Sequence, residues 1–220
     1  MTDSRSAVRV RILSGFIGTC PYMSLFRENI EEYAARWGYD LRIVTDREGD
    51  GDIYPELATY DWWWWWKVSL IEQHIGGWDW LFWIDADAMV LDMTRPLADF
   101  ISDDFSMMMT YRAGPESCVM LLRNDDWLRS FLKEWREYGK SPECLADNGG
   151  WAHNSNALES LFRRRTFPRV KFMKDDEWTI SHNFLHRRTD RTFVLHMPGT
   201  PIEAKVRASA AEESAAITMI

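Results

Sequence analysis

The amino-acid sequence predicts an α/β fold, in which a single domain has a mostly parallel central sheet flanked by helices. Two observations support this prediction. Short apolar segments alternate with longer segments of helical periodicity, in the order strand, helix, strand, helix, strand. One strand candidate, Trp80–Ile84, is apolar throughout, which is typical of a central strand buried on both faces.

The part of the chain before this strand contains two strand–helix units. Residues 8–16 alternate between polar and apolar side chains, as a strand does, and residues 24–39 place apolar side chains at helical spacing up to a glycine. Residues 40–48 begin with a short apolar segment that predicts a second strand. A helical pattern then extends over residues 55–75 and ends at a pair of glycines.

The part of the chain after Trp80–Ile84 continues the same alternation. The patterns predict strands over 105–112 and 118–124, helices over 125–139 and 154–165, and two short strands over 169–174 and 192–197. No repeat or linker divides the 220 residues, so we expect one domain over residues 1–202. Residues 203–220 are rich in Ala and lack aromatic side chains, and we expect a helical or partly disordered tail.

The composition is that of a globular protein, with 46% hydrophobic and 27% charged residues. The net charge of −8 argues against a general nucleic-acid binder. We interpret the basic run at residues 163–174 as a solvated helix end, with contact to nucleic acid as the alternative. Three cysteines without metal-site spacing, no secretory signal and no long apolar segment predict a soluble, cytoplasmic protein with reduced thiols.

An acidic pair, Asp85 and Asp87, directly follows the apolar strand. A buried strand does not tolerate charge in its middle, so the pair is expected at the strand's carboxyl end, where open α/β sheets bind ligands. Side chains at i and i+2 of an extended chain point the same way, so the two carboxylates can converge on one cation. Carboxylate oxygens suit Mg²⁺ or Mn²⁺, often together with substrate phosphates.

Two enzyme classes use such a pair. In phosphatases of the haloacid-dehalogenase type it follows the first strand of the domain, with Thr or Val two positions after the second Asp. Here two strand–helix units precede Asp85 and that later position is Met89, although residues 174–178 offer a late acidic pair like theirs. The placement disfavours this class. The second class comprises glycosyltransferases, in which a divalent cation stabilises charge on the departing nucleotide.

The segment "WWWKVSLIEQHIGGWDWLFWIDADAMVLD" resembles glycosyltransferase family 34, which has a Trp-x-Lys helix before a W-x-W-x-x-D-x-D-A strand. The segments "ESCVMLLRNDDW" and "VLHMPGT" are similar to two further blocks of that family, in the same order. The matching residues are Trp65, Lys67, Trp80, Trp83, Asp85, Asp87, Ala88, Val119, Leu121, Arg123, Asn124, Trp127, His196 and Gly199. The resemblance implies a GT-A fold, which is Rossmann-like, over the domain of residues 1–202.

The same resemblance implies a UDP-hexose or UDP-pentose donor, Mn²⁺ (or Mg²⁺) as cofactor, and transfer with retention of anomeric configuration. It implies that Asp85, Asp87 and His196 bind the metal and the diphosphate. Lys67 and Arg123 are further candidate donor contacts. Ser14 joins them because the end of the first strand commonly touches the nucleotide in this fold.

The sequence departs from the family pattern at two places. Glu116 and Cys118 stand where the family has Asn and Gly. Asn154 and Asn156 occupy the region where the family has an acid and a glutamine, and we expect both to orient the sugar by hydrogen bonding. The missing acid would then be supplied by Asp147, from the preceding loop.

Five consecutive tryptophans, Trp62–Trp66, sweep around a helix axis and cannot all face one core. We expect two or three of them to pack under the sheet and the others to line an acceptor groove or a subunit interface. The acceptor stays open: a glycan, a lipid-linked sugar, a protein or a hydroxylated base in DNA. A catalytically inactive protein that binds a nucleotide or carbohydrate is the alternative from a different class.

Overall fold

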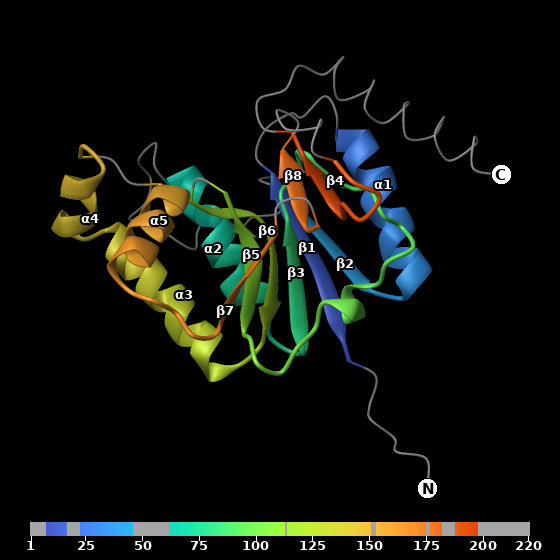
Figure 1. Cartoon of the computed structure of the whole chain (residues 1–220), viewed down its shortest axis with the longest axis horizontal. Coiled ribbons are helices and arrows are strands. Elements are labelled where there is room, and N and C mark those ends of the chain that lie inside the picture. Colours follow the sequence, from blue (N-terminus) through green and yellow to red (C-terminus); the bar gives the residue numbers. More distant parts are fainter. Residues whose placement is uncertain are drawn as a thin grey trace, which may run out of the picture.

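The structure is a computed structural model that describes residues 8–16, 23–45, 62–112, 114–150, 153–174, 177–181 and 188–197. The expected tail at 203–220, and with it the boundary at residue 202, lies outside these residues. The described part is a layered α/β fold in which helices cover a central sheet (Figure 1).

The central sheet has six strands in the order β2-β1-β3-β6-β5-β7. Their bounds are β1 Val10–Phe16, β2 Asp40–Thr45, β3 Trp80–Ile84, β5 Met107–Tyr111, β6 Pro115–Arg123 and β7 Val170–Met173. The pairs β1–β2, β1–β3 and β5–β7 are parallel, and β6 is antiparallel to both of its neighbours. The expected mostly parallel sheet is therefore confirmed, and β6 is its one reversed strand.

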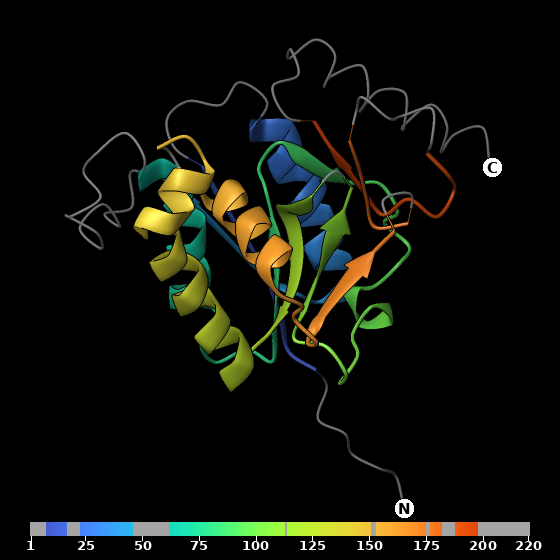
Figure 2. The same ribbon diagram turned by 60° about the vertical axis from the view of Figure 1, so that its left-hand side comes forward.

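Three helices cover one face of the sheet: α2 (Trp62–His74), α3 (Asp126–Gly139) and α5 (Asn154–Arg164). Figure 2 shows α5 lying over this face beside α3, with the short helix α4 (Pro142–Asp147) above them. The five buried residues of α3 recur at helical spacing, so the amphipathic pattern of its sequence places its apolar stripe on the sheet.

The opposite face is covered by α1 (Met23–Trp37) and by a second sheet of three short strands. The order of this sheet is β4-β9-β8, with β4 at Ala88–Val90, β8 at Thr179–Ser181 and β9 at Val194–His196. Aromatic rings fill the space between the two sheets: Trp178 packs edge-on against Phe82 of β3, with ring centroids 5.9 Å apart. The strand predicted over 192–197 contains β9, whereas β4, β8 and their assembly into a second sheet are not among the predicted elements. This small sheet positions one end of the candidate site.

Two of the five consecutive tryptophans lie in the core beneath the sheet. Trp65 is 5% exposed and packs edge-on against Trp135 of α3, and Trp66 is 8% exposed. Gly139, at the end of α3, has no side chain where the Trp65 ring approaches it. The expectation that part of the run packs under the sheet is confirmed for these two, and the side chains of Trp62–Trp64 lie outside the described residues.

No helix within the described ranges has the length and apolar character that crossing a membrane requires.

Candidate functional site

The candidate site begins where the buried strand β3 ends. Every residue of β3 is buried, and Asp85 follows directly, with its backbone N–H donating to the Cys118 carbonyl of β6 at 2.8 Å. The chain then turns through Ala86 and Asp87 into β4. The acidic pair therefore lies at the carboxyl end of a central strand, as its sequence predicts.

His196 reaches this edge through the small sheet. The ladder between β4 and β9 places His196 opposite Ala88, the residue after Asp87. The backbone N–H of Met197 also donates to the Asp87 carbonyl at 2.9 Å. Two segments more than a hundred residues apart in sequence are thus brought side by side at the turn that carries Asp87.

Asp85, Asp87 and His196 each offer one ligand atom, and these three atoms lie within 4.8 Å of one another. Nε2 of His196 is 3.4 Å from Oδ1 of Asp87. All three side chains are half-buried. Two carboxylates and one imidazole at this spacing fit a divalent cation such as Mn²⁺ or Mg²⁺, because both ions take oxygen ligands and Mn²⁺ also accepts imidazole.

The charge state of His196 depends on its neighbours. Burial disfavours the imidazolium, but Cys118 and the Asp87 carboxylate favour it more strongly and raise its pKa from 6.5 to about 11. Without a cation, His196 is therefore protonated at neutral pH and pairs with Asp87. A metal ion at this site would displace that proton, because only the neutral imidazole has a lone pair to offer.

Asp85 is held by two donors from different elements. Lys67 of α2 places Nζ 2.8 Å from Oδ1 of Asp85, and the Trp83 indole N–H donates to the same carboxylate at 2.6 Å. Lys67 also donates to the Ser117 carbonyl at 3.0 Å. Its Nζ lies 5.5 Å from the Trp83 ring centroid, within the range of a cation–π contact. The predicted donor contact Lys67 is thus part of the cluster.

The amino-terminal end of α5 lies next to this lysine. The Ser155 and Ser117 hydroxyl oxygens are 3.2 Å apart, which joins the first turn of α5 to the start of β6. The N-cap residue His153 makes no side-chain cap hydrogen bond, and the first turn carries no acidic residue. The backbone N–H groups and the dipole of this turn favour an anion.

The two asparagines of this helix have different environments. Asn154 is 4% exposed, and its side-chain oxygen accepts from the Ser155 hydroxyl at 2.9 Å. Asn156, two residues further on, is half-buried. Asn154 therefore supports the first turn from inside, whereas Asn156 keeps partial access to solvent.

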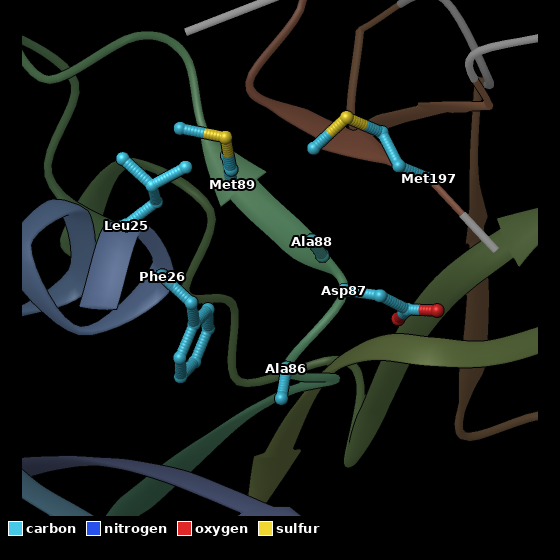
Figure 3. A pocket seen from close by; sticks show the side chains of 7 residues that line it. All are labelled: Leu25, Phe26, Ala86, Asp87, Ala88, Met89 and Met197. Carbon is cyan, nitrogen blue, oxygen red and sulfur yellow. The ribbon is translucent and has the colours of Figure 1, made fainter. Parts of the chain in front are cut away.

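An apolar pocket borders the cluster on the side of α1. It is lined by Leu25, Phe26, Ala86, Asp87, Ala88, Met89 and Met197. Figure 3 shows the Asp87 carboxylate directed away from Leu25 and Phe26. The pocket wall is thus apolar, and the charged oxygens face the opposite side.

The structure corrects the prediction for Arg123. Because β6 is antiparallel to β3, Arg123 pairs in register with Trp80 at the start of β3, while Val119 pairs with Ile84 at its end. Four residues of strand separate the two positions, or about 13 Å. Arg123 instead forms an ion pair with Asp103 at 3.0 Å, at the opposite edge of the sheet.

The structure does not bring Asp147 to the cluster either. Asp147 pairs with Arg164 at 2.6 Å, at the carboxyl-terminal end of α5. Asn154 is at the other end of that helix, and ten residues at a rise of ~1.5 Å each separate Asn154 from Arg164 by about 15 Å. In this structure Asp147 is thus held by Arg164, and its role as the acid stays a prediction.

Ser14 lies at the same edge of the sheet as the Asp85–Asp87–His196 cluster, but it is buried. It follows Leu13, which pairs with Trp83, so it is level with the last residue of β3. Its side chain is 0% exposed, and its hydroxyl has no hydrogen-bond partner among the described residues.

The basic run that ends α5 is compensated by acidic neighbours. Arg163 pairs with Glu159, Arg164 with Glu143 and Asp147, and Arg165 with Glu134. This arrangement agrees with the interpretation of a solvated helix end.

Sequence reasoning missed several groups at this edge. Trp83 was matched only as part of a motif, although its position two residues before Asp85 places both side chains on one face of the strand. Ser117 and an ion pair between Arg112 and Glu116, at 3.1 Å, were also missed. The short interval between the apolar segments of β5 and β6, which ends in Gly114, was an available signal of a hairpin.

No protein-family model matches the sequence, and no curated protein matches it. Solved structures do match: the fold is that of GT-A glycosyltransferases. A glycosyltransferase involved in glycosylation of the major capsid of PBCV-1 superposes with a TM-score of 0.69 at 17% identity, over 94% of this chain and 99% of that one.

Two other solved structures are similar at lower scores. The galactosyltransferase LgtC gives a TM-score of 0.55 at 12% identity, over 86% of this chain and 87% of that one. Mouse xyloside xylosyltransferase 1 gives 0.57 at 9% identity, over 89% of this chain and 100% of that one. At these identities the likeness establishes the fold.

Proposed function

We propose that this protein is a metal-dependent, retaining glycosyltransferase that transfers a hexose or pentose from a UDP-sugar to an acceptor hydroxyl. The observation that carries this proposal is the Asp85–Asp87–His196 cluster at the carboxyl end of β3, in a fold shared with glycosyltransferases. Membership of family 34, for which the motifs of the sequence argue, is part of the proposal.

In this proposal Asp85, Asp87 and His196 hold Mn²⁺ or Mg²⁺ against the diphosphate of the donor. The cation supplies electrophilic stabilisation of the charge on the leaving nucleoside diphosphate. Lys67 and the amino-terminal turn of α5 add positive potential at the same edge, within reach of an anionic ligand. Asn156 orients the sugar, and Asn154 fixes the turn that presents it.

A glycan is the acceptor that we favour, since the similar PBCV-1, LgtC and xyloside enzymes are by name involved in glycosylation or act on sugars. The alternative of a hydroxylated DNA base relied on the basic run, whose three consecutive arginines pair with acidic side chains. A soluble, cytoplasmic enzyme remains our expectation.

Calorimetry tests the proposal. The full-length protein is titrated with UDP, GDP and CMP and with several nucleotide sugars, with and without Mn²⁺, alongside Asp87→Ala. We expect UDP to bind only with metal, and Asp87→Ala to abolish that binding while its thermal unfolding stays cooperative. If no nucleotide binds to the wild type under any condition, the cluster is not a donor site and the proposal fails.

Slow hydrolysis of the donor separates an enzyme from a binding module. We expect the wild type with Mn²⁺ to release UDP from its donor sugar without an added acceptor. Binding of the nucleotide sugar with no release, with or without a panel of acceptors, would favour the catalytically inactive binding protein.

A further inference from the structure

Two aromatic side chains are exposed next to each other at one border of the central sheet. Tyr111, the last residue of β5, is 47% exposed, and Phe172 of the outermost strand β7 is 42% exposed. Their rings meet edge-on, with centroids 5.0 Å apart, and we call them the ring pair. In Figure 2, β7 is the orange arrow at the border of the sheet. The proposed function uses neither ring.

The ring pair lies at the same end of the strands as the metal cluster. Because β6 is antiparallel to both β3 and β5, the carboxyl ends of β3 and β5 are at one edge. The backbone N–H of Asp85 donates to the Cys118 carbonyl, and Tyr111 pairs with Pro115, three residues earlier in β6. Three residues of strand and two strand spacings separate Tyr111 from Asp85 by roughly 14 Å. The ring pair is thus too distant to contact the transferred sugar, but a short oligosaccharide spans this distance.

Helix α5 connects the two places along one of its sides. Near its carboxyl-terminal end, Phe162 packs on Phe172 with ring centroids 5.2 Å apart. Glu159, three residues earlier, lies so close to Gly114 that a Cβ added there would be 3.1 Å from the carboxyl carbon. Asn156, three residues earlier again, is half-buried near the amino-terminal turn. Residues three apart are neighbours on a helix surface, so polar side chains lead from the cluster side of α5 to the ring pair.

This combination suits a carbohydrate. A sugar ring has an apolar C–H face, which an aromatic ring can cover, and hydroxyl groups at its rim, which need polar partners. The ring pair offers the aromatic surface, and the Arg163–Glu159 ion pair of α5 offers charged groups close by. Aromatic surface with a few polar groups beside it is the usual composition of a small-ligand site.

The size of the exposed apolar surface favours a sugar ring over a protein partner. A stable protein interface takes about 800 Å² from each partner, far more than two half-exposed rings supply. Among the described residues, the other large apolar side chain that is exposed is Val8, which precedes β1 at the opposite edge of the sheet. Exposed apolar groups on an outermost strand also promote unwanted pairing, so a bound ligand gives a physical reason for their presence.

We propose that Tyr111 and Phe172 form a distal acceptor subsite, which stacks on one ring of an oligosaccharide whose far end receives the transferred sugar. This inference rests on the proposed function and narrows its acceptor to an oligosaccharide. A monosaccharide bound at the reaction site does not reach the ring pair. Loss of either ring therefore weakens binding of the acceptor and leaves the donor site unchanged.

The probe is a printed array of defined glycans, from monosaccharides to hexasaccharides, incubated with the full-length protein, UDP and Mn²⁺. We expect the wild type to bind oligosaccharides in preference to monosaccharides. Tyr111→Leu and Phe172→Leu keep apolar volume but remove the aromatic face, and each should weaken binding to the same oligosaccharides roughly tenfold. Phe172→Tyr keeps the face and should retain binding. Calorimetry should give every variant the UDP affinity of the wild type.

Val8→Ala is the control, since it truncates an exposed apolar side chain at the opposite edge, and it should change neither affinity. The inference is overturned if the wild type binds no oligosaccharide on the array, or if both Leu variants bind as the wild type does. A Leu variant that loses UDP affinity as well would indicate a structural role and would also overturn it.

Sedimentation velocity tests the other occupant, a second copy of the chain. A wild type that dimerises and a Phe172→Leu protein that stays monomeric would make the ring pair an interface between copies, against the inference. Failure of the wild type to bind UDP in the calorimeter is a separate result, which overturns the proposed function and the inference with it.

Discussion

Lys67 of α2 and Asp85 at the end of β3 form an ion pair of 2.8 Å in which the two side chains are only 13% and 25% exposed. The lysine follows Trp65 and Trp66, whose rings are buried in the core, so its backbone is fixed by packing. The pair therefore joins the tryptophan helix to the acidic edge. A cation that binds Asp85 would therefore lie close to the positively charged ammonium group of Lys67.

Replacing Lys67 by Met should lower the free energy of unfolding of the metal-free protein by about 1–3 kcal/mol, because it leaves the half-buried Asp85 carboxylate with the Trp83 N–H as its remaining side-chain donor among the described residues. Mn²⁺ should restore part of this loss, since the ion takes over the compensation of Asp85. Urea unfolding with and without Mn²⁺ measures both effects. Lys133→Met, at an exposed position of α3, is the control and should change neither. Equal losses with and without metal would contradict the prediction.

Metal affinity should depend on pH through His196. Its pKa of about 11 in the metal-free protein means that a bound cation must displace one proton. Mn²⁺ affinity should therefore rise about tenfold per pH unit between pH 6 and 8, and binding should release close to one proton. Calorimetry in two buffers of different ionisation enthalpy counts that proton. His196→Gln should bind Mn²⁺ more weakly and without this slope; a wild-type slope in the variant would refute the assignment.

The raised pKa of His196 also predicts how the stability of the metal-free protein depends on pH. Its pKa in the folded state lies above the ordinary 6.5, so protonated His196 stabilises the fold fully below about pH 6.5. That contribution is lost as the pH rises towards 11. The stability difference between wild type and His196→Gln, followed by denaturant unfolding without metal, should therefore narrow from pH 6.5 upwards. A constant difference would show that the imidazolium does not contribute.

Gly139→Ala should destabilise the protein by about 1–3 kcal/mol, since the added Cβ would lie 2.1 Å from the nearest atom of the Trp65 ring. A loss of stability would be informative, because replacing Gly by Ala within a helix normally stabilises the protein. Gly76→Ala, where a Cβ meets no atom within 4 Å, is the control for thermal unfolding. In the background of Trp65→Phe the cost of Gly139→Ala should shrink. An unchanged cost would mean that the ring is not the obstacle.

Arg123→Ala should leave the affinity for UDP and Mn²⁺ unchanged, because Arg123 lies at the edge of the sheet opposite to the cluster. Calorimetry of the variant checks this directly, with Asp87→Ala as the reference for a true loss. A strong loss of nucleotide affinity in Arg123→Ala would contradict the antiparallel register of β6.

The elements that the sequence predicts well are those with a strong local pattern. The apolar run of β3 and the amphipathic stripe of α3 depend on side chains within one element. An acidic residue that directly follows a buried strand is expected at the end of that strand, because the buried interior does not accommodate its charge. The direction of β6 in the sheet, in contrast, is not determined by the pattern of side chains within the strand. It depends on the three-residue connection after Tyr111. Arg123 became a candidate through the family motif alone, and the antiparallel register of β6 places it opposite Trp80, at the other edge of the sheet.

The remaining parts of the site depend on contacts between distant segments. His196 meets Asp87 through a ladder between two strands of three residues each. The pattern over 192–197 predicts one of these strands, but it does not indicate which segment that strand pairs with. The resemblance to a family, not the residue pattern, pointed to that histidine. The ion pair between Asp147 and Arg164 joins two different helices, and no local pattern indicates such a pair.

The ladder that holds His196 beside Asp87 has a thermodynamic consequence for the whole chain. A cation bound by both residues would act as a reversible cross-link closing a loop of more than a hundred residues. Cross-links gain their effect by removing conformations from the unfolded ensemble, and the gain grows slowly with loop length. Chelation would thus cost stability beyond the lost metal–ligand bonds, and its effect would reach strands that do not contact the ion.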